Sequence, residues 1–150
     1  MQGRHKGSSF EYEEKRDANL LKIYREVLAK ASVSTPIEAI CAAVASHECD
    51  RFWVSEERTN IVTGMMAKNM EGTLKGMTPL KRKMYLEIYS RVQKLMKEHP
   101  GMTRLQAVSE VISSPAPEFY LTPGSVEVII CKMKKKTWYK ERKRKLRHLF

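Results

Sequence analysis

Residues 21–27 of the chain read Leu21-Lys-Ile-Tyr-Arg-Glu-Val27, and residues 86–92 read Leu86-Glu-Ile-Tyr-Ser-Arg-Val92. Two further pairs follow in the same order: Thr35-Pro-Ile-Glu38 with Thr103-Arg-Leu-Gln106, and Phe52-Trp-Val-Ser55 with Phe119-Tyr-Leu-Thr122. The members of the three pairs are 65, 68 and 67 residues apart, so only short loop changes separate the halves. Such a repeat indicates that each half forms the same supersecondary unit.

The first segment of each half is predicted to be an amphipathic helix. In the first half, apolar residues recur at spacings of three and four from Leu20 to Leu28, which places them on one face of a helix over about residues 10–30. The second half repeats this stripe from Met84 to Leu95. Thr78 followed by Pro79 is typical of a helix start, and the helix is expected to end at residues 99–101.

Each half then contains two shorter predicted helices. Thr35 with Glu38, and Thr103 with Gln106, have the spacing of a capping box at the start of the second helix. After an irregular connector, Ser55 and Thr122 are expected to cap the third helix. Residues 126–130 also have high strand propensity, but the repeat and Pro123 favour a helix that continues into the C-terminal tail.

The predicted fold is therefore all-α, with two tandem trihelical repeats that resemble helix-turn-helix units and a basic helical tail. Phe52 and Phe119 are expected to occupy equivalent buried positions. The predicted segments are a disordered N-terminus over residues 1–9, a first repeat over 10–69, a linker over 70–77, a second repeat over 78–133 and the tail over 134–150.

The net charge of +11 is concentrated near the C-terminus. Residues 132–147 hold ten Lys or Arg and one acid, Glu141, whereas residues 1–131 hold 18 basic and 16 acidic residues. A basic segment on a nearly neutral body is typical of proteins that bind polyanions, namely DNA, RNA or anionic lipid.

The tail is the strongest candidate for a nucleic-acid-binding site. Lys and Arg bind phosphates and release counterions, and Trp138 and Tyr139 could stack on bases. The alternatives are a solvated charged surface and a weakly amphipathic membrane-binding segment. The candidate residues in and just before the tail are Lys132, Lys134, Lys135, Lys136, Trp138, Tyr139, Lys140, Arg142, Lys143, Arg144, Lys145 and Arg147.

Each half resembles a helix-turn-helix DNA-binding domain, because it has a second helix, a connector and a third helix that opens with Ser or Thr. The resemblance implies that the third helix enters the major groove. The exposed early positions that it assigns are Glu56, Arg58, Thr59, Asn60 and Thr63 in the first repeat, and Ser125 and Glu127, with Lys132 further along, in the second. The candidate contacts in the first repeat are Arg58, Thr59, Asn60 and, near the end of the helix, Lys68. The chain is also loosely similar to small DNA-binding proteins of phages and mobile elements, including small terminase subunits. The alternative is a plain helical repeat whose third helices pack on each other, because the connector of about eight residues exceeds the familiar turn.

Other classes of function lack sequence support. Three cysteines give no disulfide framework, which favours a cytoplasmic protein, and no apolar run approaches the roughly 20 residues of a membrane span. The histidines and cysteines lack the spacing of a zinc site. No nucleophile has a convincing base and acid beside it, so we expect no catalytic residues and no cofactor.

The sequence thus predicts a non-enzymatic protein that binds nucleic acid, with double-stranded DNA favoured over RNA, through the basic tail and the third helices. The alternative is a structural or adaptor protein. In that case the helical repeats would bind another protein or a second copy of the chain, and the tail would contact RNA or a nucleoprotein assembly. A basic exposed surface on the third helices would favour the first hypothesis, and an apolar patch there would favour the second.

Overall fold

The computed structural model describes the backbone of residues 2–149 and the side chains of residues 12–137 and 139–147. Within that part, every named element is a helix, which confirms the predicted all-α class. The helices are α1 (Gln2–Lys30), α2 (Ile37–Ala45), α3 (Glu56–Lys68), α4 (Met70–Lys75), α5 (Pro79–Glu98), α6 (Arg104–Ile112) and α7 (Pro123–Leu149).

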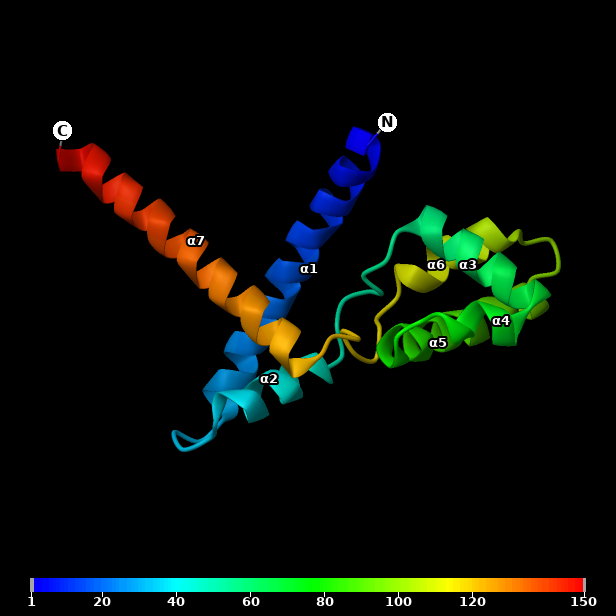
Figure 1. Ribbon diagram of the computed structural model, residues 1–150, viewed down its shortest axis with the longest axis horizontal. Coiled ribbons are helices and arrows are strands. Elements are labelled where there is room, and N and C mark those ends of the chain that lie inside the picture. The colour runs from blue at the N-terminus through cyan, green and yellow to red at the C-terminus, as the bar shows by residue number, and fades with distance from the viewer. Residues whose placement is uncertain (1, 150) are drawn as a thin grey trace.

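The helices pack in two groups that do not follow chain order (Figure 1). Helices α1, α2 and α7 pack together as group one, and α3, α5 and α6 pack together as group two, with α4 against α3. The boundaries predicted from the sequence place α3 in the first repeat and α7 in the second, whereas the packing exchanges these two helices. Each group therefore takes its third helix from the other half of the chain.

The two connectors that carry the third helices across lie antiparallel to each other. Cys49 and Ala116 form an isolated β-bridge, and each backbone N–H donates to the other's carbonyl at 3.0 Å. The Phe52 N–H donates to the Ile112 carbonyl, and the Phe119 N–H donates to the Ala45 carbonyl. Ala116, Phe119 and Ile112 each lie 67 residues after their counterparts Cys49, Phe52 and Ala45, so the connectors are related by an approximate two-fold arrangement.

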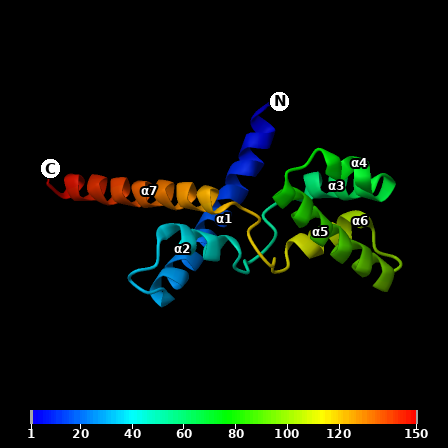
Figure 2. The same ribbon diagram turned by 60° about the horizontal axis from the view of Figure 1, so that its bottom comes forward.

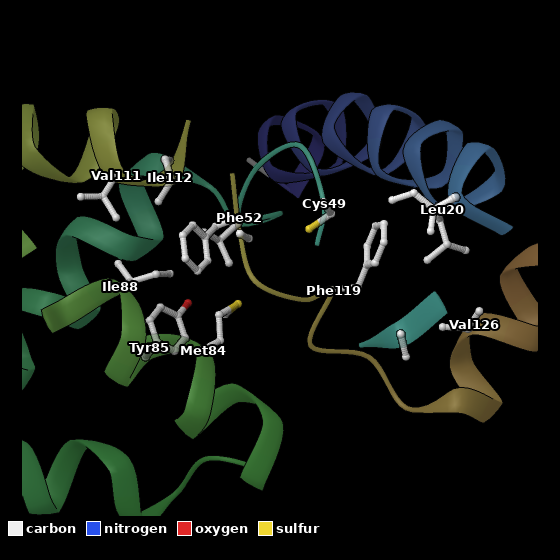
Figure 3. Close-up of a cluster of buried hydrophobic side chains, with 14 of the residues drawn as sticks. Leu20, Cys49, Phe52, Met84, Tyr85, Ile88, Val111, Ile112, Phe119 and Val126 are labelled. Atoms are coloured by element: carbon white, nitrogen blue, oxygen red, sulfur yellow. The ribbon is translucent and has the colours of Figure 1, made fainter. Parts of the chain in front are cut away.

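The two phenylalanines anchor the connectors against opposite groups of helices (Figure 3). Phe52 follows α2 in the chain but lies among residues of α5 and α6, including Tyr85 and Ile112. Phe119 follows α6 but lies near Leu20 of α1 and Val126 of α7. Both rings are almost fully buried, at 1% and 5% exposure, which confirms the predicted burial. Burying each ring in the opposite group stabilises the crossing of the connectors.

Most predicted helix starts are confirmed. The hydroxyl oxygens of Ser55, Thr78 and Thr103 each accept a hydrogen bond from a backbone N–H in the first turn. Thr103 and Gln106 form the complete capping box. The Thr122 hydroxyl likewise accepts from the Ser125 N–H at 3.1 Å, and α7 begins at Pro123 as a helix, not a strand.

The predicted capping box at Thr35 is wrong. Helix α2 begins at Ile37, and its N-cap is Pro36, which has no side chain able to accept a hydrogen bond. The N–H of Thr35 instead donates to the Ser32 carbonyl, because the turn after α1 holds this residue outside the helix. The second helices therefore correspond at 67 residues, not the 68 predicted, since Ile37–Ala45 and Arg104–Ile112 bury the same helical positions.

Two other predicted boundaries differ from the structure. Residues 2–9 of the predicted disordered N-terminus are part of α1, which begins at Gln2, and residue 1 lies outside the described residues. No proline interrupts them, and extending an existing helix costs far less than nucleating one. The predicted linker over residues 70–77 contains α4, which Asn69 caps by accepting from the Gly72 N–H at 3.0 Å.

The C-terminal half of α7 and the first turns of α1 extend beyond the packed groups and diverge from each other (Figure 2). In both views, the C-terminal half of α7 and the helices of group two lie at opposite ends of the molecule. Among the described residues, no helix combines the length and the apolar character needed to cross a membrane.

Candidate nucleic-acid interface

Helix α7 carries most of the predicted site, and its first three turns fix its direction. Val126 and Ile130 lie one turn apart on its inner face and are buried where α7 packs against α1 and α2. After Gly124 no glycine or proline interrupts the helix, so it continues through Leu149. The packed turns therefore hold the start of the basic segment in place.

Lys134 marks the point where α7 leaves the core. Its ammonium donates to the Tyr24 hydroxyl at 3.3 Å and lies 4.9 Å from the centre of the Tyr24 ring. Tyr24 itself is buried in α1. Lys134 thus attaches α7 to α1 through a hydrogen bond and a cation–π contact, a structural role that the sequence pattern does not reveal.

We call residues 135–147 of α7 the basic arm. Every described side chain in this segment is exposed, and the side chain of Trp138 lies outside the described residues. Tyr139 has 59% of its surface exposed. Glu141 is the only acid in the basic arm, whose basic residues are Lys135, Lys136, Lys140, Arg142, Lys143, Arg144, Lys145 and Arg147. Lys132, one turn before the arm, is also exposed.

The candidate residues on α3 do not form a comparable surface. Thr59 is fully buried and its hydroxyl donates to the Ser55 carbonyl at 2.7 Å, so its assignment to a nucleic-acid contact is wrong. The spacing of four from Thr59 to Thr63 explains the error, because both hydroxyls satisfy carbonyls of their own helix and can be buried. Asn60 is partly buried, and only Arg58 and Lys68 are exposed.

Arg58 also contacts a buried phenol. Burial raises the pKa of Tyr85, and the positive charge of the nearby Arg58 guanidinium partly opposes that rise. Arg58 therefore stabilises the packing of α3 on α5.

The outer surface of α3 is mixed in character. Glu56 and Glu57 open the helix, while Ile61 and Met65, one turn apart, are 48% and 50% exposed. A depression beside the start of α3 is lined by Glu56 and by Glu110, Ser109 and neighbouring residues of α6. Two carboxylates at this depression disfavour a polyanion there. Since α3 and the basic arm lie at opposite ends of the molecule (Figure 1), the structure does not bring the two parts of the predicted site together.

Two arginines outside the predicted site hold the connectors in place. The Arg51 guanidinium donates to the carbonyls of Phe52 and Val54 and lies 5.5 Å from the centre of the Trp53 ring. The Arg91 guanidinium lies 5.1 Å from the centre of the Phe52 ring and donates to the Pro115 carbonyl at 3.0 Å. Neither arginine belongs to a charge run, so no local pattern in the sequence marks them.

Two of the three cysteines, Cys41 and Cys49, are buried, and Cys131 is exposed. Burial raises the pKa of the Cys49 thiol to about 11 and also raises the pKa of Cys41, which keeps both thiols protonated at neutral pH. Among the described side chains, no three His, Cys, Asp or Glu residues are grouped so that they could hold a metal ion.

The basic arm is therefore the part of the described surface where positive charge is both dense and exposed. Neither the buried polar groups of α3 nor the connector arginines extend this surface. Searches against protein-family models, curated proteins and solved structures gave no match for this chain.

Proposed function

We propose that the protein binds double-stranded nucleic acid without catalysing a reaction, through the basic arm of α7. The observation that carries this proposal is the exposure of every described side chain from Lys135 to Arg147, in a segment with eight basic residues and one acid. A nucleic-acid duplex is the polyanion that matches this dense positive charge best, because its phosphates are closely spaced and each one that is neutralised releases condensed counterions.

The helical form of the arm supports binding as a preformed element. The arm continues a helix whose first turns are buried in group one, so its backbone is ordered before a ligand arrives. A preformed element loses less conformational entropy on binding than a flexible tail. The packed part of α7 then holds the basic arm in a fixed direction, away from the two groups.

We further propose that the two groups are copies of one trihelical unit whose third helices are exchanged. The constant spacing of 67 residues across the connector hydrogen bonds and the second helices supports this duplication. The helix-turn-helix resemblance applies to the exchanged units only in the order of helices. The acidic start of α3 and its exposed Ile61 and Met65 give that helix a secondary part in nucleic-acid binding.

A salt titration of binding to a duplex, followed by fluorescence anisotropy, tests the proposed function. Deleting residues 138–150 removes six Lys or Arg and leaves the contact between Lys134 and Tyr24 in place. The slope of log affinity against log salt is negative, and the deletion should make it less negative by up to roughly 5. Affinity should fall for every duplex sequence.

A matched pair of variants separates the arm from general surface charge. Lys140→Gln with Lys143→Gln removes two arm charges three residues apart, and Lys94→Gln with Lys97→Gln removes two exposed charges at the same spacing on α5. The arm variant should weaken binding, and the α5 variant should not. Equal losses, or no binding by the full chain at low salt, would contradict the proposed function.

The second candidate function is that of an adaptor, supported by Ile61 and Met65. These two side chains are about half exposed and one turn apart on α3, far from the basic arm. In this role the arm holds nucleic acid while α3 docks a protein. The double variant Ile61→Ser with Met65→Ser should keep the affinity for a duplex and should reduce any self-association measured by sedimentation equilibrium.

A further inference from the structure

The basic residues of α7 are concentrated on one side of the helix. Successive residues of an α-helix are turned by about 100°. On this basis, seven basic side chains fall within about 160° of the circumference: Lys132, Lys135, Lys136, Lys140, Arg142, Lys143 and Arg147. We call this set, together with Tyr139 near its middle, the basic face. The single acid of the arm, Glu141, is turned about 180° from Lys132 and lies opposite the basic face.

The packing of α7 shows that the basic face points away from the body. Three residues at intervals of four, Val126, Ile130 and Lys134, lie on the inner side of α7, which packs against α1 and α2. Lys132 lies about 160° from Lys134 around the helix and is exposed. The basic face is therefore open to a ligand that approaches from the side opposite α1 and α2.

The basic face has two flanks and a centre. Lys135 and Arg142 form one flank, and Lys136, Lys140 and Arg147 form the other. Lys132, Tyr139 and Lys143 lie between the flanks. A helix lying in a groove between two phosphate strands needs this arrangement, because its flanks face the strands and its centre faces the base edges.

Resting on the proposed function, we propose that the basic face of α7 docks lengthwise in the major groove of B-form DNA. An α-helix with its side chains is about 10–12 Å across, which matches a major groove about 12 Å wide. The stretch from Lys132 to Arg147 is about 23 Å long at 1.5 Å per residue. The major groove of A-form RNA is too narrow and deep for side chains to read, so the ligand is DNA. Glu141 faces solvent in this arrangement.

Two charge-neutral exchanges test the orientation of the face. Glu141→Lys with Lys143→Glu moves the acid to the centre of the basic face, whereas Glu141→Lys with Lys145→Glu keeps it on the opposite side. Both variants have the parent's composition and net charge, and circular dichroism checks their helicity. Anisotropy with a duplex of about 20 base pairs should show about a tenfold or greater loss for the first variant and less than a twofold change for the second.

Equal affinity of the two variants would overturn the inference, because it would mean that total charge and not the face governs binding. An RNA duplex of the same sequence provides the second comparison, and binding it as tightly as DNA would also overturn major-groove docking. Protection of guanine N7 from dimethyl sulfate reports the groove directly, and the full chain should protect it. If the parent binds neither duplex at low salt, the proposed function itself fails, which is a separate outcome.

Discussion

At the residue scale, the burial of two phenylalanine side chains is what chiefly stabilises the connectors. Phe52→Ala and Phe119→Ala should each lower the free energy of unfolding by about 3–5 kcal/mol, because each leaves a cavity in a core. Thr103→Ala should cost about 1 kcal/mol, since it removes a helix cap, and Thr35→Ala should cost less because Thr35 caps no helix. Urea denaturation of the four variants measures the ranking, and a Thr35 effect equal to that of Thr103 would contradict it.

The raised pKa values of two tyrosines lead us to expect a loss of stability at alkaline pH. Burial raises the pKa of Tyr12 and of Tyr120 from 10 to about 12. Below pH 10 both phenols are protonated in the folded and the unfolded chain. Above pH 10 the unfolded chain loses these protons first, so the free energy of unfolding should fall as the pH rises from 10 to 12.

Denaturation in urea at a series of pH values measures this fall. Tyr120→Phe removes one titrating phenol and should make the alkaline decline shallower than in the parent. Tyr139→Phe, on the exposed basic arm, serves as the control and should keep the parent's profile. If Tyr120→Phe also kept that profile, the raised pKa would make no contribution to the alkaline transition.

At the element scale, α7 has an inner side that packs and an outer side that is charged. Lys134→Gln should lower the free energy of unfolding by about 0.5–1 kcal/mol, because it removes the contacts with the Tyr24 ring and hydroxyl. Lys136→Gln removes the same charge from the basic face and should leave stability unchanged. Its effect on DNA affinity should be the larger of the two. Denaturation and anisotropy of both variants check these opposite rankings, and identical behaviour would mean that the two sides are equivalent.

Helix ends show how far local sequence determines an element. Local chemistry correctly predicts four caps, namely Ser55, Thr78, Thr103 and Thr122. The same pattern fails at Thr35 because Pro36 is acceptable both at an N-cap and at the first helical position. The choice between the two was made by the turn at Ser32 and by which residues of α2 face group one.

At the scale of the whole molecule, the exchange of α3 and α7 makes the two halves dependent on each other. Fragments 1–75 and 76–150 each contain two helices of one group and the third helix of the other. Neither fragment alone should unfold cooperatively as a monomer, whereas an equimolar mixture should recover the helical signal and the thermal transition of the full chain. Circular dichroism and sedimentation measure both properties. A monomeric fragment with its own sharp transition would show that the third helix can fold back onto its own half.

Local sequence patterns are enough to predict the helical class, the order of the helices, most of their caps and the concentration of charge near the C-terminus. These properties depend on periodicity, capping chemistry and composition, which act over a few residues. The exposed basic arm follows from the same local rules, since a helix of charged residues after a packed segment finds no core to join.

Which helices pack together depends on contacts between residues far apart in the chain. A pattern of apolar residues shows which face of α3 or α7 is buried, but both cores offer an apolar surface of the same kind, so the pattern does not select the partner. The choice was made by the connectors, whose reciprocal bonds between Cys49 and Ala116 and whose buried Phe52 and Phe119 draw each third helix across. The same non-local packing buried Thr59, placed Lys134 on Tyr24 and set α3 and the basic arm at opposite ends of the molecule.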